Sequence, residues 1–186
     1  MTDDELDQLR RDVRELKDRA AILDVVNRHA RGCDRHDEDL LTATYHPDGE
    51  DEHGAVRNAG PAYARFINGV HAATSQAHTH NITTHTCAID GDTAHAETYV
   101  LVALLGPDGG STTVMSGRYV DRLERRDGQW RIAARRSTVD LVLTGSAALL
   151  HHPGFVSQVY PRGSRDRDDP SYARPLDLDV AGGPVW

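Results

Sequence analysis

The chain has 186 residues, enough for one domain with a sizeable hydrophobic core and too few for two of ordinary size. Its formal net charge of −8 argues against a nucleic-acid-binding surface, which needs a clustered excess of Lys and Arg. No segment approaches the roughly 20 apolar residues that span a bilayer, and the charged N-terminus lacks the apolar core of a secretory signal. We therefore expect a cytoplasmic protein that contacts neither nucleic acid nor membrane.

Apolar residues recur at three- and four-residue steps through residues 3–32, which predicts a long helix that Gly32 would cap. Residues 1–17 are almost wholly charged outside this stripe. They are expected to form a helical extension that projects from the body or packs on a neighbour. A second helix is predicted at 38–45, ahead of Pro47.

The run HPDGEDEHG after the second helix is interpreted as a polar turn. Its acidic residues 48–52 lack the alternating oxygen ligands of a calcium loop and are expected to be solvated. A short strand or loop near 55–58 follows. A third helix is predicted to begin at Gly60-Pro61, where proline is tolerated.

Four strand-like runs follow, at 80–89, 93–105, 112–124 and 130–140, and Asp-Gly turns connect most of them. Asp-Gly supplies the positive φ of tight hairpins, so the runs predict an antiparallel meander. Helices followed by a continuous sheet indicate an α+β domain, placed at 18–160. Within it, 141–160 is expected to cover the open end of the sheet. Residues 161–186 are expected to form an irregular tail.

The polar residues that suggest chemistry are a carboxylate after the first helix and histidines on the first long strand. Residues two apart in a strand share a face, so His78 and His80 should point one way and His85 the other. An aspartate that accepts a hydrogen bond from one ring nitrogen fixes the tautomer and leaves the other nitrogen as a base. Asp34, beside small residues at the helix end, is placed to enter such a cavity.

Three stretches carry a resemblance to a known family. They are DRAAILDVVNRHARGCDRHDEDLL, HTHNITTHTCAIDGDTAHAETY and GRYVDRLERRDGQWRIAARR, which together span roughly residues 18–140. They resemble the SnoaL-like branch of the nuclear-transport-factor-2-like superfamily, which includes hexachlorocyclohexane dehydrochlorinase, scytalone dehydratase and bile-acid 7α-dehydratase. The resemblance implies a cone-shaped, curved antiparallel sheet wrapped around N-terminal helices, as in cystatin-like α+β barrels.

The resemblance also implies roles for single residues. Asp34 matches the family's aspartate and His80 its catalytic histidine. Arg135 matches an arginine that assists the leaving group in some members. Its neighbour Arg136 is the rival, because strand alternation sends the two to opposite faces. The remaining pocket candidates are His29, Tyr45, His78 and Tyr119.

His29 falls where relatives place a tyrosine or another polar residue, so a phenol acting as general acid would have to come from Tyr45 or Tyr119. No metal or other cofactor is expected. The two cysteines lack CxxC spacing, and the pair His151-His152 has no carboxylate or cysteine at ligand spacing.

These features predict a cofactor-independent lyase or isomerase, of dehydratase, dehydrohalogenase or cyclase type. His80 and Asp34 would remove a proton from a small hydrophobic substrate in an enclosed pocket. Two alternatives stay open: a non-catalytic ligand-binding or assembly module of the same fold, and the small subunit of a ring-hydroxylating dioxygenase. A homo-oligomer is expected, a trimer as in the related dehydratases or a dimer as elsewhere in the superfamily.

Overall fold

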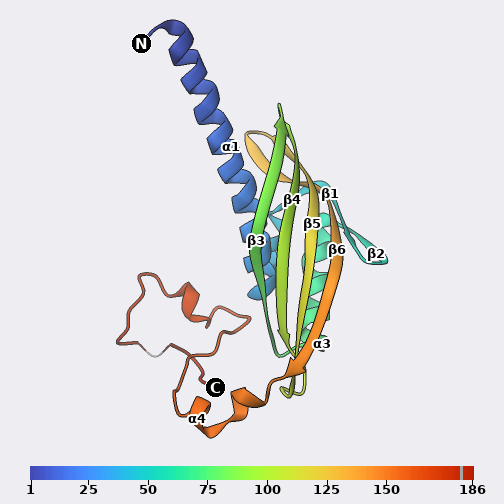
Figure 1. Cartoon of the computed structure of the whole chain (residues 1–186), viewed down its shortest axis with the longest axis vertical. Coiled ribbons are helices and arrows are strands. Elements are labelled where there is room, and N and C mark those ends of the chain that lie inside the picture. The colour runs from blue at the N-terminus through green and yellow to red at the C-terminus, as the bar shows by residue number, and fades with distance from the viewer. Residues whose placement is uncertain (181) are drawn as a thin grey trace.

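A computed structural model describes residues 1–180 and 182–186 (Figure 1). The helices are α1 (Asp3–Asp34), α2 (Glu38–Thr42), α3 (Gly60–Thr74) and α4 (Pro153–Val156), with short 3₁₀ helices η1 (Ala148–His151) and η2 (Pro170–Tyr172). The strands are β1 (Tyr45–His53), β2 (Val56–Ala59), β3 (Ala77–Asp90), β4 (Thr93–Leu105), β5 (Ser111–Arg126) and β6 (Gln129–Ser146).

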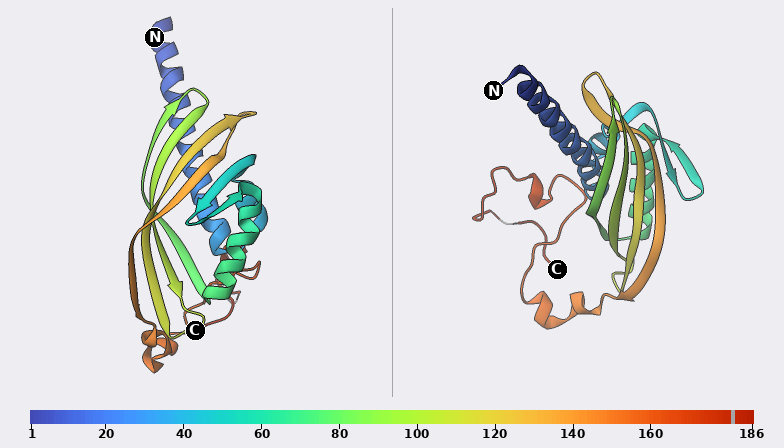
Figure 2. Two further views of the ribbon diagram at one scale, coloured as in Figure 1. Left: turned by 90° about the vertical axis from the view of Figure 1, so that its right-hand side faces the viewer. Right: turned by 45° about the horizontal axis from the view of Figure 1, so that its top comes forward.

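The six strands form one curved sheet in the order β2-β1-β6-β5-β4-β3, with α1 and α3 on the same face (Figure 2). Strands β3 to β6 are the antiparallel meander predicted from the Asp-Gly turns. The sheet as a whole is mixed, because β1 pairs parallel to β6. The α+β class and the curved sheet backed by N-terminal helices are confirmed.

Helix α1 begins with a capping box, in which Thr2 and Glu5 exchange side-chain and backbone hydrogen bonds. It continues past Gly32 to Asp34, so the expectation of a Gly32 cap is wrong. Gly32 serves close packing: a Cβ there would lie 2.8 Å from the Cβ of Leu41 in α2. The first turns of α1 project beyond the sheet, and Leu16 is 66% exposed (Figure 1).

The polar run HPDGEDEHG is not a turn but most of β1, and the second helix ends at Thr42 rather than at residue 45. Pairing with β2 on one side and β6 on the other satisfies its backbone, which offsets its poor strand composition. Within it Asp51 is fully buried, so the expectation that the acidic residues are all solvated is also wrong.

The core lies between α1, α3 and the inner face of the sheet. Two contacts fix α1 against the hairpins: the indole N–H of Trp130 donates to Asp18 at 2.9 Å, and Arg19 donates to the carbonyl of Cys87 at 2.9 Å. The main cluster of buried apolar side chains includes Ile22, Val25, Leu41, Tyr45, Tyr63, Ile67, Leu123 and Ile132.

The C-terminal region differs from expectation. Strand β6 runs to Ser146, and Leu141 and Leu143 are 54% and 57% exposed, so this segment covers no open end. The tail packs on the body instead, although it holds little regular structure. Asp169 lies 3.3 Å from the Arg35 guanidinium, and the Tyr172 hydroxyl donates to Asp37 at 3.0 Å.

We predict opposite effects for two glycine-to-alanine substitutions. A Cβ at Gly117 would lie 2.0 Å from the carbonyl oxygen of Thr138 on β6, so Gly117→Ala should destabilise the fold by about 1–3 kcal/mol. Gly69 is exposed within α3 with no atom near its Cβ position, so Gly69→Ala should stabilise by about 0.5–1 kcal/mol. Urea unfolding of both variants tests this. A stable Gly117→Ala would mean that β5 and β6 are further apart than described.

Candidate functional site

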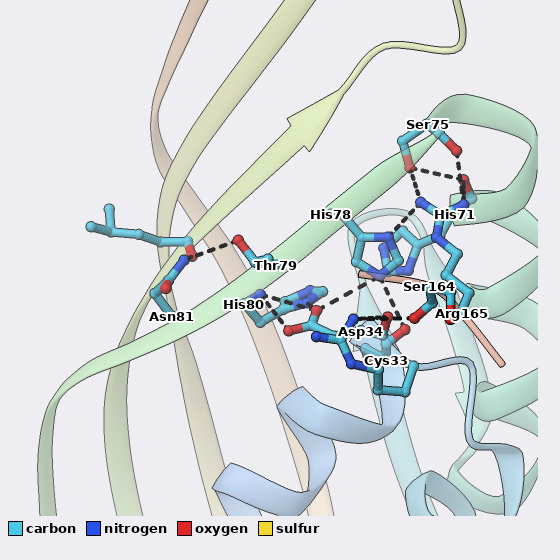
Figure 3. Close-up of polar contacts among 12 residues, drawn as sticks. Cys33, Asp34, His71, Ser75, His78, Thr79, His80, Asn81, Ser164 and Arg165 are labelled. Atoms are coloured by element: carbon cyan, nitrogen blue, oxygen red, sulfur yellow. Dashed lines mark hydrogen bonds and ion pairs between the residues drawn. The ribbon is translucent and has the colours of Figure 1, made fainter. Parts of the chain in front are cut away.

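Asp34 and His80 meet where the end of α1 packs against the start of β3 (Figure 3). The His80 Nδ1 lies 2.6 Å from Asp34 Oδ1, and the His80 backbone N–H donates to both carboxylate oxygens at 3.0 Å. The two side chains are 7% and 13% exposed. Because a carboxylate only accepts, Nδ1 carries the proton and Nε2 keeps a lone pair. No described residue forms a hydrogen bond with Nε2.

His78 lies beside this pair and is held at both ring nitrogens. Its Nε2 donates at 3.0 Å to the carbonyl of Cys33, which also accepts the backbone N–H of His36 at 3.3 Å at the end of α1. Its Nδ1 accepts from the Arg165 guanidinium at 2.7 Å. His78 therefore has the opposite tautomer to His80 and is neutral. The shared face of the two histidines was predicted, but the contact with Arg165 was not.

His71 of α3 and His36, which follows α1, complete a cluster of four imidazoles with His78 and His80. The rings of His71 and His78 are 3.9 Å apart, centroid to centroid. Burial lowers the pKa of His71 to about 2 and that of His78 to about 3, and the neighbouring imidazoles add to both shifts. At neutral pH these rings are uncharged and pack as polar aromatic groups.

A second group of polar side chains is buried deeper in the domain. The Tyr45 hydroxyl donates to Asp51 at 2.6 Å, so the His29 Nε2 at 3.2 Å must be the donor to that hydroxyl. Burial raises the pKa of Asp51 to about 6. The pKa of His29 is lowered well below its usual value by burial, then by the charges of Arg135 and His80. His29 is therefore within electrostatic reach of the base.

Of the two rival arginines on β6, Arg135 is buried, while Arg136 is on the other face and pairs with Glu52 at the surface. The guanidinium of Arg135 forms two hydrogen bonds with Asp121, both of 2.7 Å, and lies 4.0 Å from the centre of the Tyr119 ring. Its charge is thus largely neutralised by Asp121. Its Nη1 is buried and has no hydrogen-bond partner among the described residues.

His85 is on the inner face, so the prediction from strand alternation is wrong here. The register of β3 against β4 shifts between Ile82 and His85, where Thr83 and Thr84 face Tyr99 alone. This bulge reverses the alternation. His85 is half-buried, and its Nδ1 lies 2.8 Å from the hydroxyl of Thr98. It stands further along β3 and takes no part in the contacts around Asp34.

The C-terminal tail forms the outer wall of the site. Beside its contact with His78, Arg165 donates to the Ser75 carbonyl at 2.8 Å and to the Ser75 hydroxyl at 2.6 Å (Figure 3). A pocket of about 310 Å³ lies between this segment and the body, with Asp34 and His78 on its inner side. Its lining is rich in polar and charged side chains, unlike the apolar enclosed pocket that we expected.

Sequence reasoning missed several of these residues for different reasons. Asp51 was assigned to a turn, because the polar composition of β1, which contains both Tyr45 and Asp51, is not typical of a strand. His71 lies on the inner face of a helix whose apolar stripe was recognised, and that spacing could have revealed it. Arg165 had no such signal, because the composition of the tail predicts irregular structure.

Two groups of side chains have donor atoms within 4.8 Å of one another, a spacing that suits a metal ion: His36, His71 and His78, and Asp34, His78 and His80. His78 belongs to both. A metal bound by His78 would have to displace either its hydrogen bond to Cys33 or that from Arg165.

A model of the SnoaL-like domain matches residues 14–136. No curated protein sequence matches the chain. Among solved structures, a hexachlorocyclohexane dehydrochlorinase from Novosphingobium barchaimii is 23% identical, with a TM-score of 0.67 over 72% of this chain and 94% of its own.

Two further structures have the same fold. A scytalone dehydratase-like protein from Novosphingobium aromaticivorans is 18% identical, with a TM-score of 0.63 over 69% of this chain and 88% of its own. A protein of unknown function from Mycobacterium tuberculosis is 28% identical, with a TM-score of 0.60. The match covers 68% of this chain and 74% of that protein. In the described part of this chain, no helix is both long and apolar enough to cross a membrane.

The buried imidazoles predict an acid-sensitive fold. Unfolded histidines bind protons below pH about 6.5, whereas His71 and His78 stay neutral in the folded state down to about 2 and 3. Stability should therefore be lost as the pH falls below 6.5, by up to about 1.4 kcal/mol per pH unit and histidine. Asp51 acts in the opposite direction: because its pKa is raised from 3.8 to about 6 in the folded state, it adds stability as the pH falls from about 6 to 3.8.

Urea unfolding at several pH values should give a shallower pH dependence for His71→Gln than for the unsubstituted protein. Substitution of the exposed His95 by Gln, a matched change outside the cluster, should leave the dependence unaltered. Equal slopes for all three proteins would contradict the assignment of His71 as a buried neutral group.

Proposed function

Because this chain belongs to the SnoaL-like domain family, we propose that it is a lyase or isomerase in which His80 removes a proton from carbon. The observation that supports this most directly is the 2.6 Å contact between His80 Nδ1 and Asp34. A carboxylate that fixes the tautomer and stabilises the imidazolium is what a histidine base requires. A module that only holds a ligand has no need of this pair.

In the proposed reaction, Nε2 of His80 takes the proton and the carbon keeps the electron pair. The pair then expels a leaving group such as hydroxide or halide, or moves into a new double bond or ring. The imidazolium is the acid nearest to the reacting atoms, so it can return the proton to a departing oxygen or to a second carbon. Asp34 stabilises the charged ring between the two steps.

The buried polar side chains around Tyr45 and Asp51 would support this chemistry without transferring a proton to the substrate themselves. The Tyr45 proton is committed to Asp51 and the side chain is buried in the core, so Tyr45 would hold Asp51 and His29 in place rather than act as a general acid. His29 and Tyr119 would line the same interior. The assignment of Arg135 to leaving-group assistance is modified by its pairing with Asp121: it would orient Tyr119 and contribute a partly neutralised positive charge.

The carbon skeleton of the substrate is proposed to be small and apolar. A second buried apolar cluster, built from Val26, Val100, Val102 and Tyr119, lies on the inner face. Ile82 packs against it and shares the inward direction of His80, two residues earlier on β3. An apolar wall beside the base would exclude water and strengthen the interactions of the developing charge.

We predict that both members of the pair are needed for turnover. On cyclic β-hydroxy or β-halo carbonyl compounds that the protein converts, His80→Gln and Asp34→Asn should each lower kcat/KM by about 10²–10⁴-fold. The exposed His95→Gln should not change it. Full turnover by either dyad variant, folded by circular dichroism, would refute the mechanism.

The outer face of the sheet supports a proposal of self-association. Several apolar side chains that β-pairing places on this face are 37–57% exposed: Tyr99, Leu101, Val114, Val120, Leu141 and Leu143. Leu101, Ser116 and Leu141 lie in one row across three strands, and Ala103, Val114 and Leu143 in the next. An exposed apolar surface of this kind is usually covered by a second copy of the same chain.

We predict that the chain forms a homo-oligomer. A trimer is favoured, and a dimer is the alternative. Analytical ultracentrifugation of the full chain should give a mass above the monomer, and Leu141→Lys with Leu143→Lys should shift it toward the monomer. A stable, monodisperse monomer would contradict self-association. Purification only together with a larger chain would favour the small-subunit alternative.

A further inference from the structure

We propose that Arg165 is a specificity-determining residue and that the pocket beside it binds a carboxylate group of the substrate. This tail pocket is the space of about 310 Å³ between the C-terminal tail and the body. The inference deepens the proposed function, on which it rests for the reacting end of the substrate. The binding step itself depends only on the pocket and its charges.

The tail pocket places arginines opposite Asp34 of the dyad. Its inner side is formed by Asp34 and His78, and its outer side by residues of the tail, including Arg162 and Arg165. A small molecule in this space would have one end at the tail and the other end next to the Asp34–His80 pair. The pocket and the dyad thus share Asp34, although His80 itself does not line the pocket.

The charge of Arg165 has no carboxylate partner among the described residues. Its hydrogen bonds go to neutral acceptors: the carbonyls of His71 and Ser75, the Ser75 hydroxyl and the His78 ring. Its Nε is buried and has no hydrogen-bond partner in the described parts of the chain. Three other arginines that are at least partly buried pair with aspartates, namely Arg35 with Asp169, Arg125 with Asp18 and Arg135 with Asp121, whereas the half-buried Arg31 and Arg131 form no such pair within the described chain.

Arg162 adds a second cation to the same wall. Its guanidinium reaches Gln76 at 3.5 Å and lies 4.9 Å from the centre of the Trp186 ring, and it too forms no ion pair within the described chain. Burial lowers the pKa of Arg165, the nearby charge of Asp34 partly opposes this shift, and repulsion from Arg162 adds to it. An anion between the two would relieve that repulsion and supply the missing partner.

The opposite wall determines the orientation. Asp34 carries negative charge and already accepts hydrogen bonds from His80, so it repels a second carboxylate at the inner end of the pocket. The carboxylate of a ligand must therefore lie at Arg165, and its carbon skeleton toward the dyad. A neutral ligand of the same shape gains nothing from the two arginines.

The tail holds Arg165 in a defined position. Asp169 accepts from the backbone N–H of Ser164 at 2.9 Å and lies 3.3 Å from Arg35 at the end of α1. The Tyr172 hydroxyl donates to Asp37. The guanidinium of Arg31 lies over the Tyr172 ring, 5.0 Å from the centre of that ring. These anchors on both sides of the α1 end reduce the entropy that Arg165 loses when it binds an anion.

The test uses benzoate as a probe and benzamide as its neutral counterpart of the same shape. Isothermal titration at low ionic strength should give saturable benzoate binding at least ten times tighter than that of benzamide, weakening as salt is added. Arg165→Gln should lose at least tenfold in benzoate affinity, with benzamide unaffected. Arg174→Gln removes the same charge from an exposed position in the same tail and should bind benzoate normally.

Three results would each overturn the proposal: no saturable benzoate binding, equal binding of benzamide, or unchanged benzoate affinity in Arg165→Gln. A thermal melt of Arg165→Gln checks its fold, and Arg165→Lys, which keeps the charge, should retain part of the affinity. His80→Gln should still bind benzoate within about threefold. This separates the two ideas, because loss of turnover with intact benzoate binding would leave the pocket assignment standing.

Discussion

The hydrogen bond between Asp34 and His80 joins the end of the longest helix to the first long strand. It does so through a carboxylate that also accepts the backbone N–H of His80, so the position of α1 on the sheet and the orientation of the base are fixed by the same oxygen atoms. A carboxylate at a helix C-terminus is unfavourable toward the helix dipole. The 2.6 Å contact with the His80 ring and the shared backbone N–H of His80 offset that cost and give the helix end a chemical role.

The interior around this bond holds many titratable groups and little net charge. Arg135 and Asp121 neutralise each other, while His71 and His78 remain neutral because burial lowers their pKa. Asp51 is the exception, because burial raises its pKa to about 6 and its charge therefore changes just below neutral pH. Neighbouring imidazoles that stay neutral can orient the base without competing for its proton.

Much of this arrangement follows from local sequence rules. Asp-Gly turns predicted the meander, and two-residue alternation placed His78 and His80 on one face, while the pairing of His80 with Asp34 required the family resemblance. Alternation failed at His85 because a bulge reverses it, and composition failed at β1, whose polar residues are stabilised by strands on both sides. Such effects depend on partners distant in the sequence, which no local pattern records.

The site extends further along the chain than the shared fold, because the C-terminal tail contributes residues to the site but no strand to the sheet. The family's domain ends at residue 136, and a chain cut after β6 would retain all six strands and the Asp34–His80 pair. It would lack the guanidinium that holds the Nδ1 of His78. Two proteins that agree throughout the shared domain can therefore present different surroundings to the same base, and substrate choice can diverge while the catalytic pair stays unchanged.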